Sequence, residues 1–316
     1  MEIPNEERRF FFDLYDEVNS SSNARTTIET RYCRYCSLPN PTFLQHAHLV
    51  PELLGINKTI NYYECDKCNS LGSIIEKDFA SFLDLRRVIL RTRAKNGWPK
   101  IDFSREQGRG SMQFINNQVL LNTTYRSKDS IVALTNDSIR IRYLTRKLKP
   151  FNIFKIFLKL FIGLLPEDSF AANQHLKALW QSDCPNFYTS YFKLFRMELG
   201  NKGFAEPVCY LFKVKNDGLL CDNYSEYSLI LGYGNLVFQF VPPITSNFLN
   251  LADLCKPTNI ELYPYFVMSD SMPVPLKDDL VSFNINIEEI DTSITSKVKF
   301  IDIVSLRMQN KELLLV

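Results

Sequence analysis

The sequence predicts an α+β protein: a small cysteine-rich finger near the N-terminus, followed by a larger mixed domain of helices and antiparallel sheet. Three observations support this prediction. Four cysteines occur in two close pairs, apolar residues at helical spacing follow the second pair, and many short β-type segments follow residue 100. The predicted divisions are a lead-in helix and linker (1–30), the finger (31–80), a bridging helix with strands (81–150), and an α+β domain (151–316) for recognition, sensing or regulation.

The cysteine pairs define the finger. Cys33 and Cys36 are separated by two residues, and so are Cys65 and Cys68 further along the chain. This spacing lets a tight knuckle direct both sulfurs at one point, so the four thiolates can hold one tetrahedral Zn²⁺. We expect the zinc to be structural, because four protein ligands leave no coordination position for water or substrate.

Two of the three histidines of the chain, His46 and His48, lie between the cysteine pairs. The second begins the sequence His48-Leu-Val-Pro51, which is followed by a turn containing Gly55 and, directly after the last cysteine, by Asn69. This order of motifs resembles the HNH endonucleases, which fold as a ββα-metal finger, and the closest subgroup resembles bacterial restriction and phage-defence nucleases. The resemblance implies that His48 is the general base and that Asn69 binds a divalent catalytic ion.

The chemistry of phosphodiester hydrolysis supports these roles independently. The reaction needs a base that deprotonates the nucleophile, and a neutral histidine such as His48 is suited to this task. It also needs a cation near the phosphate, and the amide oxygen of Asn69 suits Mg²⁺ or Mn²⁺. Glu76 follows Asn69 by seven residues, on the same face of a predicted helix, and is therefore a candidate carboxylate ligand.

One position departs from the usual family pattern. Most HNH members have an aspartate ligand directly before the general base, where this chain has Ala47. His46, Glu76 and Asp66 are competing candidates for the missing ligand. The asparagine that orients the base is also open, because Asn57 and Asn61 lie in the same loop; the site prediction includes Asn61. Four cysteines at this spacing also occur in zinc ribbons that only stabilise a fold or bind a partner.

The remaining elements follow from local patterns. A hairpin across 42–64 and a helix from about residue 69 complete the finger, and apolar spacing extends that helix to about residue 89. The apolar segment 151–165 predicts a buried helix that is too short for a bilayer, and Pro166 starts another helix that continues through Trp180. Strands are predicted at 111–115, 118–121, 131–134, 139–143, 208–214, 227–231, 236–241, 263–267, 281–287 and 297–303.

Composition limits the functional classes. A formal charge of +2 gives no global attraction to DNA, so any nucleic-acid surface must be local, as in the arginine-rich stretches 86–93 and 140–149. The first residues lack the basic start and apolar core of a signal peptide, and four further cysteines are scattered singly. These features predict a cytoplasmic protein with reduced thiols and no membrane partner.

The sequence therefore predicts a metal-dependent DNA endonuclease of the HNH type that acts in restriction or anti-phage defence. Its cofactors would be structural Zn²⁺ and catalytic Mg²⁺ or Mn²⁺, and its C-terminal domain would select the target or gate the activity. DNA is the expected partner, and a homodimer is expected because one finger cuts one strand. The alternatives are a zinc-dependent binding module without catalysis and an effector activated by a small signal nucleotide.

Overall fold

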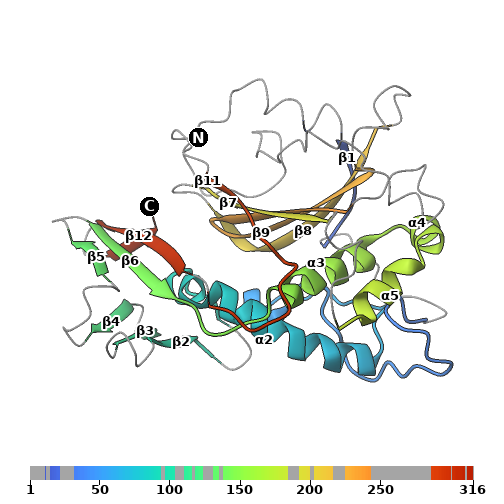
Figure 1. Cartoon of the computed structure of the whole chain (residues 1–316), viewed down its shortest axis with the longest axis horizontal. Coiled ribbons are helices and arrows are strands. Elements are labelled where there is room, and N and C mark those ends of the chain that lie inside the picture. Colours follow the sequence, from blue (N-terminus) through green and yellow to red (C-terminus); the bar gives the residue numbers. More distant parts are fainter. Residues whose placement is uncertain are drawn as a thin grey trace.

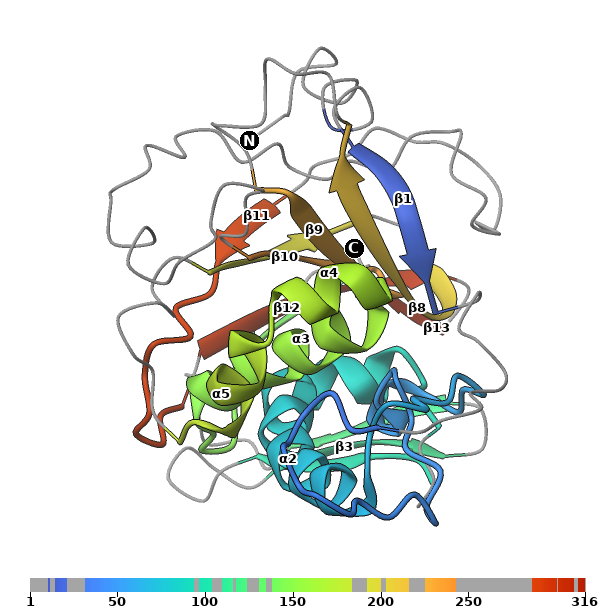
Figure 2. The same cartoon turned by 90° about the vertical axis from the view of Figure 1, so that its right-hand side faces the viewer.

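The computed structural model describes Phe11 and residues 15–21, 32–93, 97–103, 110–115, 118–123, 131–134, 138–183, 192–199, 203–215, 225–242, 286–299, 301–309 and 312–315. Three layers position the finger. A six-stranded antiparallel sheet forms the first layer, helices α3 (Pro150–Leu164) and α2 (Asp66–Ile89) form the second, and the cysteine-rich segment packs on these helices as the third (Figures 1 and 2). The structure is thus α+β, as the sequence predicts.

Helix α2 begins directly after Cys65 and continues without a break through residue 80, where the sequence analysis ended the finger. Its apolar residues recur at three- and four-residue spacing and are buried against α3 and the sheet. Two arginines near its end bond other parts of the chain. Arg86 is 1% exposed and donates to Glu198 (2.6 Å), and Arg87 donates to the carbonyl oxygen of Leu53 (3.0 Å). The suggestion that arginines of this stretch contact phosphate is therefore wrong for Arg86, whereas for the half-buried Arg87 it stays a prediction.

Helix α3 confirms the predicted buried helix, with Pro150 in its first turn, where a missing N–H costs nothing. The single helix expected after Pro166 is instead two short helices, α4 (Glu167–Ala172) and α5 (His175–Gln181). The chain turns at Asn173, whose backbone N–H bonds Phe170 and whose amide bonds the Ser169 carbonyl oxygen. No helix in the described ranges is long and apolar enough to cross a membrane.

The strands form three sheets. The six-stranded sheet has the order β1-β8-β9-β10-β7-β11, and the smaller sheets have the orders β13-β12-β6-β5 and β2-β3-β4. In chain order, the strands are β1 (Tyr15–Ser20), β2 (Lys100–Phe103), β3 (Gly110–Ile115), β4 (Gln118–Thr123), β5 (Ile131–Leu134), β6 (Ser138–Leu144), β7 (Lys193–Glu198), β8 (Phe204–Val214), β9 (Tyr227–Gly234), β10 (Leu236–Val241), β11 (Asn286–Glu289), β12 (Ile301–Gln309) and β13 (Glu312–Leu315).

Strand β1 corrects one prediction, and two predicted strands lie wholly or mostly outside the residues that the structure describes. Residues 15–20 were assigned to a lead-in helix and linker, but they pair with β8 at the edge of the large sheet. The aromatic residues that suggested a helix serve this strand: Tyr15 stacks on Phe11 (4.9 Å between ring centroids) and its hydroxyl donates to the Ser225 carbonyl oxygen (2.6 Å). The strand expected at 263–267 lies outside the described residues, and so does most of 281–287.

One hydrophobic core joins the three layers. Phe79 of α2, Phe157 of α3 and Phe238 of β10 contact one another with ring centroids 5.5–6.0 Å apart. The same cluster of buried residues includes Cys33 and Leu49 of the finger. The finger therefore shares its core with α3 and the sheet, because a segment of this size cannot bury enough apolar surface alone.

A buried lysine crosses from α3 to the finger. Lys159 is 2% exposed, and its Nζ lies 3.0 Å from Oε1 of Glu64 and 3.5 Å from Oε1 of Glu76. Burial opposes the charge of Lys159, but the two carboxylates outweigh it and raise the pKa of the lysine. Burial raises the pKa of Glu64 to about 7, although Lys159 partly offsets this effect. The contact fixes two points of the finger, the residue before Cys65 and the middle of α2, to α3.

We predict that Lys159→Met lowers the free energy of unfolding by about 3–5 kcal/mol, because it leaves the Glu64 carboxylate buried without a cation. Urea unfolding measures this loss. Lys155→Met is the matched control: Lys155 is equally buried one turn earlier, but its Nζ donates to the Ser182 carbonyl oxygen (2.9 Å). Equal losses in the two variants would show that the carboxylate contact is not what matters.

Candidate metal centre and adjoining histidine

The four finger cysteines converge on one point. All four sulfurs lie within 4.8 Å of one another, with Cys33 and Cys68 3.8 Å apart and Cys36 and Cys65 3.7 Å apart. A zinc ion bound at about 2.3 Å by four thiolates requires sulfurs about 3.8 Å apart. These residues therefore fit the predicted zinc, and within the described part of the chain they form the one cluster of three or more metal-ligating side chains.

Local structure explains how the first pair is positioned. The backbone N–H of Tyr35 donates to the Cys33 sulfur (3.4 Å), as expected for a knuckle, and the N–H of Arg34 donates to the Tyr63 carbonyl oxygen (2.9 Å). Arg34 is 1% exposed, and its guanidinium donates to the Leu165 carbonyl oxygen (2.6 Å) just after α3. Arg34 thus supplies hydrogen bonds to carbonyl oxygens left unpaired at the end of α3, and these bonds fix the knuckle to that end of the helix.

The second pair is held by the start of α2. Cys65 is the N-cap residue of this helix and Cys68 lies in its first turn, so a rigid element presents both sulfurs. Crowding makes the thiols unequal: the Cys68 thiol stabilises the Cys33 thiolate and lowers the pKa of Cys33 to about 5, whereas burial raises the pKa of Cys65 to about 11. A cation between the sulfurs removes this competition, because it favours the thiolate at every position.

Between the pairs, the chain forms a very short hairpin. His48 is bridged to Ile60, the N–H of Leu49 donates to Thr59 (2.9 Å), and the N–H of Asn61 donates to Ala47 (2.7 Å). A loop with a 3₁₀ turn, η1 (Glu52–Leu54), joins the two sides. The predicted hairpin across 42–64 is thus shorter than expected, and α2 follows it three residues earlier than expected.

His48 lies at the surface of the hairpin beside a carboxylate. Its Nε2 is 3.4 Å from Oε1 of Glu52, and its side chain is 22% exposed. Its Nδ1 is buried, and no described residue offers it a hydrogen bond. A buried N–H without an acceptor is costly, so the neutral imidazole carries its proton on Nε2, towards Glu52. Nδ1 is then the nitrogen with the free lone pair.

Asn69 faces the chain segment that leads to His48. Its Nδ2 donates to Oε1 of Gln45 (3.1 Å), and its amide oxygen has no donor among the described residues. The same segment is fixed by Asp66, whose carboxylate accepts the N–H groups of Gln45 (2.8 Å) and Leu44 (3.1 Å). Hydrogen bonds from Thr42 and these amides lower the pKa of Asp66. Asp66 therefore supports the loop, and this role accounts for its carboxylate without a metal.

Two other predicted site residues have structural contacts. Asn61 is 5% exposed, and its Nδ2 donates to the Tyr35 hydroxyl (2.7 Å) and to Oε2 of Glu64 (3.1 Å). It is thus part of the interior, and no contact joins its side chain to His48. Glu76 lies against Lys159, as described above, which accounts for its carboxylate without a metal. Of the candidates for the missing ligand, His46 remains, and it is exposed.

Sequence reasoning missed two residues of the site. Glu52 stands four residues after His48, a spacing that brings side chains together when a turn separates them, but the sequence analysis gives it no role. Gln45 was not considered, because nothing in a sequence indicates that its amide meets Asn69 across 24 residues. Comparison with protein-family models, with curated proteins and with solved structures finds no significant match, so these assignments depend on the residues themselves.

We predict that the purified protein carries one zinc ion per chain and that Cys65→Ser abolishes its binding. Cobalt substitution provides the measurement, because a tetrahedral cobalt–thiolate centre absorbs strongly. The variant should also unfold at lower temperature, since zinc binding in small fingers contributes about 10–16 kcal/mol of folding free energy. Cys209→Ser is the control: Cys209 is a buried thiol in β8, outside the cluster, and its loss should leave the cobalt spectrum unchanged.

Proposed function

We propose that this protein is a metal-dependent HNH-type endonuclease that hydrolyses DNA phosphodiester bonds. The observation that carries the proposal is the connection between the cysteine cluster and the two motif residues. The second cysteine pair lies on the first turn of α2, which also bears Asn69, and the short hairpin that bears His48 lies between the pairs. Asn69 in turn bonds Gln45, three residues before His48.

In this proposal His48 accepts the proton of the attacking water. A neutral imidazole with Nε2–H directed at Glu52 leaves Nδ1 as the base, and the carboxylate of Glu52 stabilises the imidazolium that forms. Glu52 is therefore a positioning residue. Nδ1 is buried, so the base must become accessible when substrate binds, as is common for sites whose catalytic contacts tighten only in the complex.

A divalent ion would stabilise the charge that develops on the phosphate. The amide oxygen of Asn69 is suited to hold Mg²⁺ or Mn²⁺, because it is a hard oxygen ligand whose position is fixed through Gln45. His46 is exposed two residues before His48 and can supply an imidazole. Asp66 and Glu76 already make structural contacts, so Asn69 and His46 are the better candidates for ligands of the divalent ion.

A second candidate function has its own observation. Ala47 is 2% exposed and occupies the position at which related fingers carry an acidic ligand, so nothing there can bind a cation. This favours a zinc-dependent DNA-binding module that does not cleave. DNA contact without cleavage would rest on exposed cations such as Arg93. Arg140 and Arg142, which belong to the second basic stretch proposed for DNA contact, lie in strand β6, but their side chains are outside the described part of the structure.

The biological role also remains a proposal. Fingers of this kind contact mainly phosphate and sugar and therefore discriminate little between sequences. We propose that the layers built on α3 and the large sheet select the target or gate the activity, in restriction or anti-phage defence. Gating by a small signal nucleotide and cutting by a homodimer are variants of this proposal. Cleavage that depends on methylation would favour target selection, and cleavage only after an added ligand would favour gating.

We predict that His48→Ala lowers plasmid cleavage by about 10²–10⁴-fold, the usual contribution of a general base. Cleavage should need Mg²⁺ or Mn²⁺ and stop with a chelator that leaves the zinc in place. His175→Ala, which changes the histidine at the start of α5, should cleave normally. If purified protein binds DNA equally well with and without His48 but never cleaves methylated or unmethylated plasmid, the binding module is the better description.

We predict further that Glu52→Ala lowers kcat by about tenfold or more and leaves KM for DNA nearly unchanged, because a carboxylate that orients a functional histidine typically contributes 10–100-fold. Glu52→Gln should retain part of the activity, since its amide oxygen keeps an acceptor beside Nε2 of His48. Glu206→Ala, which removes an exposed carboxylate from β8, is the control. Equal rates in all three variants would remove Glu52 from the mechanism.

A further inference from the structure

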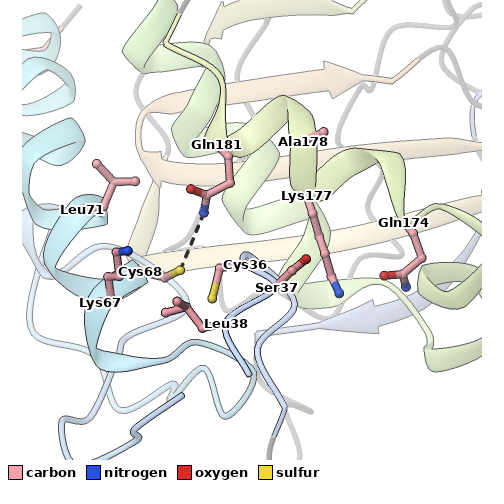
Figure 3. A pocket seen from close by; sticks show the side chains of 10 residues that line it. All are labelled: Cys36, Ser37, Leu38, Lys67, Cys68, Leu71, Gln174, Lys177, Ala178 and Gln181. Carbon is pink, nitrogen blue, oxygen red and sulfur yellow. Dashed lines mark hydrogen bonds between the residues drawn. The ribbon is translucent and has the colours of Figure 1, made fainter. Parts of the chain in front are cut away.

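A pocket of about 580 Å³ lies beside the cysteine cluster, on the side towards α5. Three elements form its walls: the knuckle after Cys36, the first turns of α2, and α5 (Figure 3). Its volume is in the range of sites that hold small molecules. The lining residues are Cys36, Ser37, Leu38, Lys67, Cys68, Leu71, Gln174, Lys177, Ala178 and Gln181.

The charge of this pocket is one-sided. Lys67 enters from α2 and Lys177 from α5, and no carboxylate of the described residues lines the space between them (Figure 3). Neither ammonium group forms an ion pair with a described carboxylate. The Nζ of Lys177 instead lies 5.4 Å from the centroid of the Phe170 ring, a cation–π contact that does not neutralise its charge. Two unpaired cations from different elements favour an anionic occupant.

Polar groups beside the lysines suit a tetrahedral oxyanion. Ser37 offers a hydroxyl, and Gln174 offers the amide N–H that does not donate to the Phe170 carbonyl oxygen, so donors are available in addition to the two ammonium groups. Lysine binds phosphate as a compact point charge and does not need the planar geometry that arginine and carboxylate share. Leu38 and Leu71 add apolar wall, which a bare inorganic ion could not use. A phosphate ester, with an organic group attached, matches both parts of the lining.

We infer that the pocket between the cysteine knuckle, the start of α2 and α5 is a binding site for a phosphate ester. The shared chemistry allows two sources: the end of a free nucleotide or a phosphate group of a nucleic-acid strand. The site does not depend on cleavage at His48. Because Cys36 and Cys68 form part of its wall, an occupant would contact the same two segments that the zinc joins.

A competing explanation for the lysines is the metal centre itself. Zinc with four thiolates carries a net negative charge, and Lys67 and Lys177 line the same pocket as Cys36 and Cys68. If the lysines serve mainly to balance that charge, removing them would weaken zinc binding even without a ligand. If they serve a ligand, zinc retention would be unchanged and ligand affinity would fall. Zinc retention and ligand affinity, measured in one variant that lacks both lysines, therefore distinguish the two explanations.

The test uses the full chain loaded with zinc and isothermal titration with three probes: AMP, a single-stranded thymidine pentanucleotide, and uncharged adenosine. The variant is Lys67→Gln combined with Lys177→Gln. Lys77→Gln is the matched control, because Lys77 is an exposed lysine of α2 that does not line the pocket. Zinc release to a coloured chelator is followed in each protein before any probe is added.

We expect AMP or the pentanucleotide to bind the wild-type chain, adenosine to bind much more weakly, and the double variant to lose at least about tenfold in affinity, as for lost charge-assisted contacts. Tighter binding of AMP would identify a free nucleotide as the source, and tighter binding of the pentanucleotide would identify a strand. The inference is overturned if neither probe binds, if Lys77→Gln loses as much affinity as the double variant, or if the double variant releases its zinc more readily.

Discussion

Four sulfur atoms within 4.8 Å of one another are the constraint on which the candidate site depends. Thiols packed this closely compete for protons, and a shared cation is the simplest way to hold them together. Their convergence joins the knuckle at Cys33 to the start of α2 across more than thirty residues. Everything between them is then confined to a short loop structure, and the hairpin that bears His48 has few conformations left. The position of the histidine thus follows from the sulfur cluster rather than from an extended sheet.

Two buried cations extend this constraint into the rest of the molecule. Arg34 binds carbonyl groups at the end of α3, and Lys159 of α3 reaches back to Glu64, next to Cys65. Each would be costly alone, because a charge in the interior must be fully compensated. Together they fix the finger to α3 from both directions, and α3 in turn packs under the large sheet. A change in the position of the sheet would therefore reach the histidine through helices α2 and α3 and not through a flexible linker.

The sequence predicted correctly those features that depend on the spacing of residues along the chain. The cysteine spacing led to the cluster, the helical pattern led to α2 and α3, and alternation led to most strands of the described sheets. It failed where a partner lies far away in the chain. Glu76 and Asn61 are of residue types that suit a site. However, Glu76 contacts Lys159 and Asn61 donates to the Tyr35 hydroxyl, and both partners lie far away in the sequence. Residues 15–20 were misread because aromatic residues fit a helix and an edge strand equally well, and only the partner strand β8 decides between them.

The shared core has a consequence for how such a finger can change over generations. A domain with its own interior can be exchanged between proteins as a unit, with only a linker to adjust. Here the apolar side of α2 is completed by Phe157 and Phe238, and the carboxylate of Glu64 is compensated by a lysine that belongs to α3. A finger transferred without α3 would expose that side and leave an acid buried without its cation. Inheritance of this finger therefore entails inheritance of the helix beneath it, and the two must diverge together.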